Sequence, residues 1–206
     1  MPKGRGEARE KLLQAAVDVI RAKGYIAATV EELCQRAGVT KGAFFHHFQS
    51  KEDLGVDAAA YWSETTDAVF AAAPYQQIAD PVDRVLAYVE FRKSLLTGAI
   101  AGFTCLVGTM AQEVYDTHPP IRQACADSIL NHAGQVERDI AAAMAATGVE
   151  IEGGARGLAL YTQAVLQGAF VLAKATGDPA VAAGCVDHLH RYLQQLLRPD
   201  TTEQAN

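Results

Sequence analysis

The sequence predicts an all-α fold. From Ser50 onward, apolar residues recur at helical spacing in nearly every stretch between glycine and proline breaks. These breaks lie near residues 74, 80–81, 98–102, 119–120, 148–154 and 177–179, and no stretch keeps the apolar and polar alternation of a strand. Half of the 206 residues are hydrophobic, so the chain is long and apolar enough to bury a core.

The first fifty residues predict three short helices with clear ends. A first amphipathic helix over residues 7–23 ends before Gly24. Thr29 starts a second helix, with Glu32 completing a capping box, and Gly38 ends it. Thr40 then caps a very short third helix. A further helix starts where Ser50 and Asp53 repeat the capping signal, and the inward positions of the third helix are Phe44 and Phe48.

Charge is distributed unevenly along the chain. The net charge of −6 argues at first against a nucleic-acid partner, because DNA affinity depends on lysine and arginine. Residues 1–51, however, hold nine basic and five acidic residues, while the remaining residues carry a net charge of −10. This asymmetry predicts a DNA-binding segment joined to a body that does not bind DNA. We assign the DNA-binding domain to residues 1–50, the ligand-binding and dimerisation body to residues 51–200 and a flexible tail to residues 201–206.

The third helix has the properties of a helix that enters the major groove. Burial of its two inward phenylalanines leaves Lys41, Gly42, Phe45 and His46 facing outward. Lys41 can donate to guanine or phosphate, and Phe45 can contact a thymine methyl. A helical bundle that carries these residues on its surface by chance is the alternative. Helix starts favour phosphate, and the residues at or beside them are Thr29, Thr40, His47 and Lys51.

Residues 24–54, GYIAATVEELCQRAGVTKGAFFHHFQSKEDL, resemble the tetracycline-repressor (TetR) family of transcriptional regulators. The resemblance implies a homodimer of about nine helices per subunit, in which the first three bind DNA and the fourth leads to a ligand-binding domain. It implies DNA-contact roles for Thr29, Thr40, Lys41, Gly42, Phe45, His46, His47 and Lys51. Phe45 stands where the family usually has tyrosine, so the hydroxyl contact to the DNA backbone is missing.

The last two predicted helices, at about residues 155–175 and 179–197, favour pairing with a second copy of the chain. The first of them is uncharged over most of its length and rich in small residues. The second starts at Asp178 and carries an apolar seam. Completion of the monomer core remains the alternative for both helices. Residues 94–112 and 157–173 carry no charge, but a membrane span is the less favoured explanation, because both stretches contain Thr, Gln and Gly. The expected seam consists of Ala182, Val186, Leu189, Leu193 and Leu196.

The body is predicted to bind a small, mostly apolar effector between its helices. For each candidate lining residue taken alone, a plain core position is the favoured alternative. Cys105 also supports a second hypothesis, an electrophile- or redox-responsive repressor, because it lies near a predicted helix start, where a thiolate is favoured. An inert buried thiol is the alternative. The candidate effector contacts are Trp62, Tyr88, Phe91, Phe103, Cys105, Met110, Gln163, Gln167 and Phe170.

The sequence favours a binding protein over an enzyme. It shows no nucleophile with an ordering base, no phosphate loop and no carboxylate pair. Cys185, His188 and His190 are close in sequence, but the two histidines diverge by about 140° on one helix. We therefore expect no metal and no cofactor. The four cysteines lack paired short spacings and the start lacks an apolar leader, which together predict a reduced, cytoplasmic protein.

Overall fold

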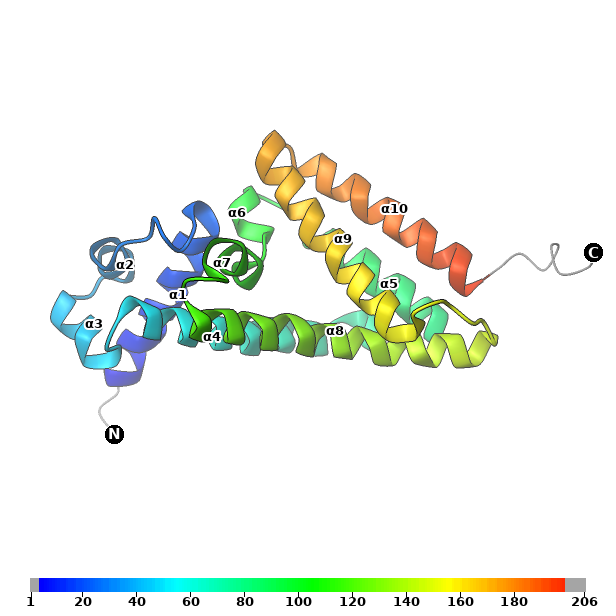
Figure 1. Ribbon diagram of the computed structural model, residues 1–206, viewed down its shortest axis with the longest axis horizontal. Coiled ribbons are helices and arrows are strands. Elements are labelled where there is room, and N and C mark those ends of the chain that lie inside the picture. Colours follow the sequence, from blue (N-terminus) through cyan, green and yellow to red (C-terminus); the bar gives the residue numbers. More distant parts are fainter. Residues whose placement is uncertain (1–3, 199–206) are drawn as a thin grey trace, which may run out of the picture. The chain divides into compact units, whose positions relative to one another are not determined.

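The computed structural model describes residues 4–198, and over this range it consists of helices and turns with no β-strand (Figure 1). The predicted all-α class is confirmed. The elements are α1 (Gly4–Lys23), α2 (Val30–Ala37), α3 (Lys41–His47), α4 (Lys51–Ala71), η1 (Pro74–Gln77), α5 (Pro81–Ser94), α6 (Ile100–Phe103), α7 (Leu106–Val114), α8 (Pro119–Thr147), α9 (Gly154–Thr176) and α10 (Pro179–Leu197).

The helix ends follow the glycine and proline signals closely. Gly24 and Gly38 have φ angles of 93° and 66°, in the region where glycine carries no Cβ penalty. Residues 4–198 contain ten α-helices where about nine were expected. The break at residues 98–102 holds the single turn of α6, and Cys105 then begins α7 as its N-cap.

The described chain forms two compact units. The first contains residues up to Ala68 together with Thr104–Ile129, and the second contains Val69–Phe103 and the residues from Leu130 on. Helices α4 and α8 contribute residues to both. This division does not follow the expected boundary at residue 50, which stays a prediction about the extent of the DNA-binding part. The predicted tail, 201–206, lies outside the described residues.

In the first unit, α1, α2 and α3 pack around a shared core to which α7 contributes Leu106 and Met110. The predicted inward residues of α3 are buried, Phe44 at 0% and Phe48 at 1% exposure. Burying a phenylalanine removes enough apolar surface from water to contribute about 2 kcal/mol. A seven-residue helix is not stable alone, so this packing holds α3 in place.

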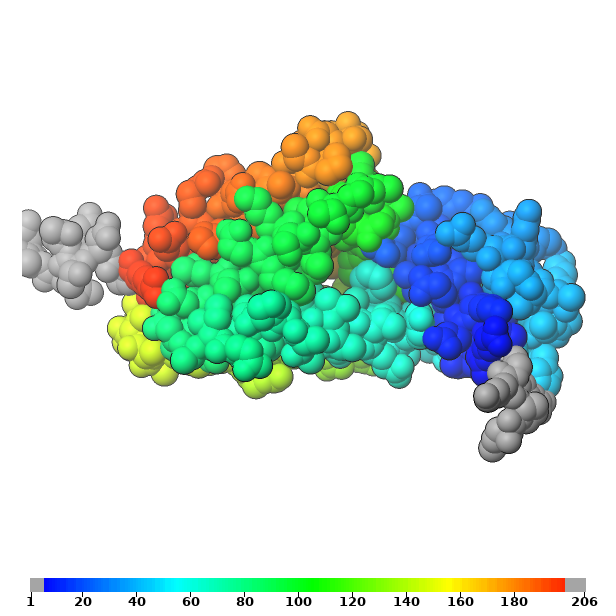
Figure 2. All heavy atoms as spheres, turned by 180° about the vertical axis from the view of Figure 1, so that it is seen from behind, coloured from blue at the N-terminus to red at the C-terminus, as the bar shows by residue number. Residues whose placement is uncertain are grey.

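In the second unit, α9 and α10 run in opposite directions side by side, and α10 also packs on α5 (Figure 1). Figure 2 shows α5, in green, spread over a face that Figure 1 hides. The α10 seam is buried, but its last member is Leu197, at 0% exposure, whereas the expected Leu196 is only half-buried. This seam therefore packs in the core of the chain itself, which was the alternative to pairing with a second copy.

Helix α9 is long and apolar enough to cross a membrane by length and composition. It also buries Leu158, Leu166 and Phe170 in the core of the second unit, and 44% of its most apolar window is buried. Core helices of globular proteins meet the same criterion, so this single helix does not indicate a span.

Candidate functional site

Two threonine caps fix α2 and α3. The Thr29 hydroxyl accepts a hydrogen bond from the Glu32 amide at 3.2 Å, and the Thr40 hydroxyl accepts one from the Ala43 amide at 3.1 Å. Each cap stabilises its helix by about 1 kcal/mol. The predicted capping box at Thr29 is only partly observed, because the Glu32 carboxylate pairs with Lys23 of α1. These caps orient the turn between the two helices.

The outward face of α3 is the one that the sequence predicts. Lys41, Gly42, Phe45 and His46 are exposed, Phe45 by 57%. The Phe45 ring meets buried Phe44 edge to face, with their centroids 5.1 Å apart. The ring lies on the same face as Lys41 and His46, where a partner surface can reach it. The face contains no acidic residue, so it suits phosphate and base edges.

Lys41 is engaged in the free protein. Its ammonium group forms an ion pair with the carboxylate of Glu31 in the first turn of α2, and this bond lowers the pKa of Glu31. Both side chains are more than half exposed, so the pair is weak and can exchange for a DNA contact. Sequence reasoning missed this pair, because residues ten apart meet only through the turn.

Lys51 has a different environment from the other predicted DNA contacts. Its ammonium group donates to the carbonyl oxygens of Tyr25 and Ala28 at 3.0 Å and of Ile26 at 3.3 Å. Burial lowers the pKa of this group, although nearby Glu113 opposes the change. All three ammonium protons therefore have acceptors within the protein, and a phosphate contact by Lys51 stays a prediction.

The loop between α1 and α2 is also held from α7. The Glu113 carboxylate accepts a hydrogen bond from the Ile26 amide at 2.9 Å and lies against Gly24, where a Cβ atom would come within 1.8 Å of it. His118 packs edge to face on Tyr25 with centroids 5.5 Å apart. The loop that leads into Thr29 is thus fastened to α4 by Lys51 and to α7 by Glu113.

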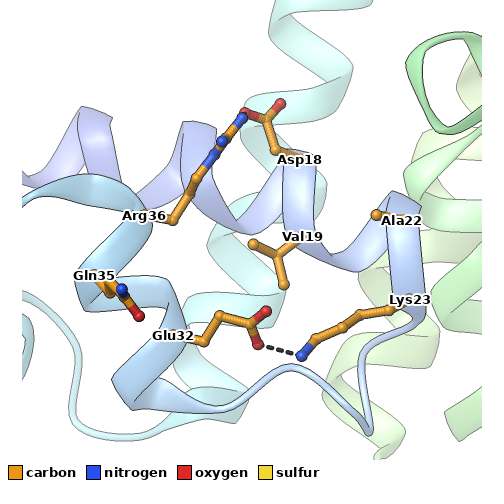
Figure 3. A pocket seen from close by; sticks show the side chains of 7 residues that line it. All are labelled: Asp18, Val19, Ala22, Lys23, Glu32, Gln35 and Arg36. Carbon is orange, nitrogen blue, oxygen red and sulfur yellow. Dashed lines mark hydrogen bonds and ion pairs between the residues drawn. The ribbon is translucent and has the colours of Figure 1, made fainter. Parts of the chain in front are cut away.

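A groove of about 600 Å³ lies between α1 and α2 in the first unit. Two ion pairs cross it, Arg36 with Asp18 at 3.0 Å and Lys23 with Glu32 (Figure 3). Since its charged side chains are already paired, the groove does not suit a mostly apolar effector. The two ion pairs connect α1 to α2. Its lining residues are Asp18, Val19, Ala22, Lys23, Glu32, Gln35 and Arg36.

Three of the predicted effector contacts lie in the first unit. Trp62 carries the Arg21 guanidinium over its ring, 4.9 Å from the centroid, and Met110 is fully buried. The Cys105 sulfur caps α7 by accepting from the Gly108 amide at 3.4 Å. Cys105 is half-buried, and it interacts electrostatically with Arg21. The predicted position of Cys105 at a helix start is confirmed.

The other predicted effector contacts lie in the second unit. Tyr88 and Gln163 are buried and joined by a hydrogen bond of 3.3 Å from the Gln163 amide to the Tyr88 hydroxyl. Phe103 and Phe170 pack with centroids 6.3 Å apart, and Gln167 is half-buried. Phe91 packs against Phe70, at a centroid distance of 5.8 Å.

Two residues that contact or lie beside Tyr88 were missed by sequence reasoning. His132 of α8 lies with its Nε2 2.9 Å from the Tyr88 hydroxyl oxygen. Arg92 of α5 places a guanidinium nitrogen 3.4 Å from the same Nε2. Arg92 stands four residues after Tyr88, on the same side of one helix, and this spacing was the available signal. Nothing in the local sequence singles out His132.

Two models of known protein families match most of the chain. Residues 12–57 match the family model described as bacterial regulatory proteins of the tetR family, and residues 81–189 match a tetracyclin repressor-like C-terminal domain. The repressor NemR of Escherichia coli is 30% identical over 125 residues, 57% of this chain and 59% of that protein. YxaF of Bacillus subtilis, an uncharacterised regulator, is 27% identical over 59% of this chain and 63% of its own length. The alignments thus cover about six tenths of these relatives.

Solved structures agree in fold. A TetR-family regulator from Agrobacterium tumefaciens superposes with a TM-score of 0.81 at 21% identity, covering 91% of this chain and 98% of that one. The regulator from Chloroflexus aurantiacus gives the same TM-score at 24% identity, with 94% and 97% coverage. Proteins of this family bind DNA and small-molecule effectors and act as dimers. The two family models together span the helix-turn-helix and most of the remaining helices, and the chain belongs to the TetR family of transcriptional regulators.

Proposed function

We propose that the chain is a cytoplasmic, homodimeric repressor that binds a palindromic operator through α3 and is released by a small, mostly apolar effector. The observation that carries this proposal is the outward face of α3, which is basic and aromatic and stands on two buried phenylalanines. A helix presented in this way fits the major groove, where residues near its start meet base edges.

The proposed contacts divide by chemistry. Lys41 and Phe45 contact bases, while Gly42 allows the backbone to approach the groove. His46 faces the groove together with Lys41 and Phe45. Thr29 and Thr40 contact the DNA backbone from the starts of α2 and α3, and His47 does so from the end of α3, just before α4. Lys51 is assigned to the same group by position, although its ammonium group is engaged with the α1–α2 loop.

An exposed apolar face on α9 supports dimerisation through the last two helices. Leu160, Tyr161, Val171 and Leu172 are 39–47% exposed and recur at helical spacing, with exposed Gly168 between them. Tyr192 of α10 extends this face, with its ring 5.3 Å from that of Tyr161. A second copy of the chain that pairs its own α9 and α10 here would complete a four-helix bundle.

Release requires that the effector prefer a dimer whose two α3 helices no longer match sites about 34 Å apart. The expected coupling is about 1–3 kcal/mol, and by reciprocity operator binding weakens effector binding by the same factor.

The test of operator recognition uses the full chain and the DNA that it selects from a random pool. Lys41→Ala and Phe45→Ala are expected to weaken binding of the selected site at least tenfold. Arg122→Ala removes an exposed basic residue on α8 of the same unit and should leave affinity unchanged. Equal affinity of wild type and both α3 variants would refute the proposal.

The test of the dimer interface compares two exposed leucines. Leu172→Glu on α9 is expected to give a monomer by sedimentation and to lose operator binding. Leu130→Glu on α8, which is exposed to a similar extent, serves as the control. A Leu172→Glu protein that stays dimeric removes α9 from the interface.

A second candidate mechanism is a switch at Cys105. The thiol is half-buried at the start of α7, where its sulfur accepts a hydrogen bond from the Gly108 amide at 3.4 Å. In that mechanism the thiolate adds to the electrophilic carbon of an unsaturated carbonyl compound, and the α-carbon takes up the proton. N-ethylmaleimide should then release operator from wild type and from Cys185→Ser but not from Cys105→Ser. Release from Cys105→Ser would exclude the mechanism.

A further inference from the structure

A polar cluster lies among aromatic rings inside the second unit. Tyr88 and Arg92 come from α5, His132 from α8 and Gln163 from α9. The His132 Nε2 atom is 2.9 Å from the Tyr88 hydroxyl and 3.4 Å from the Arg92 guanidinium, and the Gln163 amide donates to the Tyr88 oxygen at 3.3 Å. Four polar side chains from three helices thus converge where the surroundings are apolar.

The surroundings of Arg92 are aromatic. Its guanidinium carbon is 5.2 Å from the centroid of Phe70 and 6.0 Å from that of Phe170. The Phe70 ring also stacks obliquely on His132, with centroids 4.5 Å apart. Contacts of a cation with ring faces contribute about 0.5–2 kcal/mol each. The remaining rings of the cluster are Tyr75, Tyr88 and Phe91.

Arg92 differs from the other basic residues of α5. Arg84 pairs with Asp139 at 3.1 Å, and Lys93 pairs with Asp187 at 2.5 Å. None of the ion pairs in the part of the chain that the structure describes includes Arg92. A half-buried cation without a carboxylate is costly, and ring faces offset only part of that cost.

The cluster has more hydrogen-bond donors than acceptors. Burial and Arg92 lower the pKa of His132 to about 3, so the ring is neutral at physiological pH. Since a guanidinium only donates, His132 accepts at Nε2 and carries its proton on Nδ1. That single lone pair faces both the Tyr88 hydroxyl and Arg92, and the Arg92 contact at 3.4 Å is long for a hydrogen bond. The guanidinium therefore keeps donors that lack a good acceptor within the cluster.

We propose that Arg92, held beside Tyr88, His132 and Gln163, recognises the carboxylate of a small monoanionic effector, whose planar or apolar body lies against the surrounding rings. This proposal rests on the proposed function, and it names the chemical class of the effector. One cation balances one negative charge, and a planar guanidinium matches a carboxylate in a two-point contact. A doubly charged phosphate ester would bring a second charge that the cluster does not balance.

Matched acids and amides test this proposal directly. Binding of benzoate, cinnamate and butyrate to the full chain is compared with that of benzamide, cinnamamide and butyramide by ligand-observed NMR. At least one acid is expected to bind ten times more tightly than its amide. Arg92→Gln should abolish this preference, and Arg92→Lys should retain part of it, because the charge remains while the planar fork is lost. The proposal is overturned if no acid exceeds its amide, or if Arg92→Gln keeps the preference.

Two controls separate charge recognition from general effects. Arg156→Gln removes an exposed arginine of α9 that pairs with Glu137, and it should leave the acid preference unchanged. Circular dichroism establishes that each variant is folded. Operator binding without ligand is measured separately, so loss of the proposed function appears as failure to bind DNA. Failure of the present inference appears instead as equal binding of acid and amide by a protein that binds its operator.

Discussion

The ammonium nitrogen of Lys51 lies 4.3 Å from the ring centroid of Tyr25 and donates a hydrogen bond to the carbonyl oxygen of the same residue at 3.0 Å. A residue at the start of α4 thereby holds the loop that leads into α2. The start of α2 depends on this contact, because the loop positions the Thr29 cap.

Replacing Lys51 distinguishes its contact with the α1–α2 loop from the predicted contact with a DNA phosphate. Lys51→Met should lower the free energy of unfolding by about 1 kcal/mol, because the carbonyl oxygens of the α1–α2 loop lose their donor. If the contact is only structural, the slope of log affinity against log salt for operator binding stays unchanged. A fall in that slope by about one unit identifies a phosphate contact. Urea unfolding and binding titrations at several salt concentrations measure both quantities.

The ion pair between Glu31 and Lys41 predicts that a conservative change strengthens DNA binding. Glu31→Gln removes a negative charge close to the phosphates and frees Lys41, so operator affinity should rise about threefold at low salt and less at high salt. Fluorescence anisotropy with labelled operator measures this change. Glu7→Gln, which breaks the exposed pair with Lys11 on α1, is the control. Weaker binding by Glu31→Gln would show that the pair orients Lys41 for its contact.

Local signals in the sequence predicted the helix ends and the inward residues of α3 in the first unit. Thr29, Gly38 and Thr40 act within one helical turn, so their roles follow from sequence spacing alone. The inward phenylalanines of α3 followed from helical periodicity in the same way. Lys51 looked like a surface cation at a helix start because its acceptors lie more than twenty residues away.

The second unit was harder to predict, since its helices are apolar on more than one side. The apolar seam of α10 was visible in the sequence, but whether it packs within the chain or between chains depends on where α5 and α9 lie. The cluster at Arg92 was not predicted for the same reason, because it depends on how distant helices pack. Its members come from three helices, and no local pattern links His132 to residues 31 to 44 positions away.

Glu113 of α7 lies against Gly24 of the α1–α2 loop, and a double-mutant cycle measures the interaction between these two residues. Gly24→Ala should cost about 1–2 kcal/mol of stability, from its φ of 93° and from the collision of the new methyl group with the Glu113 carboxylate. In a Glu113→Ala background the collision disappears. The stability cost of Gly24→Ala should therefore be smaller in that background by about 0.5–1 kcal/mol.

The control for this cycle is Gly38→Ala. Gly38 also has a positive φ, of 66°, but a Cβ atom there meets nothing within 4 Å. Its cost should therefore be the same with and without Glu113. If Gly24→Ala also proves additive with Glu113→Ala, Glu113 does not lie against Gly24 in solution.

His132 makes the stability of the protein depend on pH. Its pKa is about 3 in the folded chain and near 6.5 when unfolded, so below about pH 6.5 the unfolded chain binds a proton that the folded chain does not. The contribution to stability is complete above this pH and falls by about 1.4 kcal/mol per pH unit as the pH decreases from 6.5 towards 3. His132→Gln should remove this component, so that its loss of stability between pH 7.5 and 5.5 is smaller than that of wild type by about 1 kcal/mol.

Urea unfolding at a fixed protein concentration measures the difference, because a dimer gains stability with concentration. His188→Gln replaces an exposed histidine of α10 in the same unit and should keep the pH dependence of wild type. The comparison is restricted to pH 5.5 and above, where carboxylates in the unfolded chain are still mostly ionised. Parallel curves for wild type and His132→Gln would show that His132 is hydrated and free to take up a proton in the folded state. In that case the Arg92 guanidinium would also lie in water, and the cluster would lose the low polarity on which its preference for a carboxylate depends.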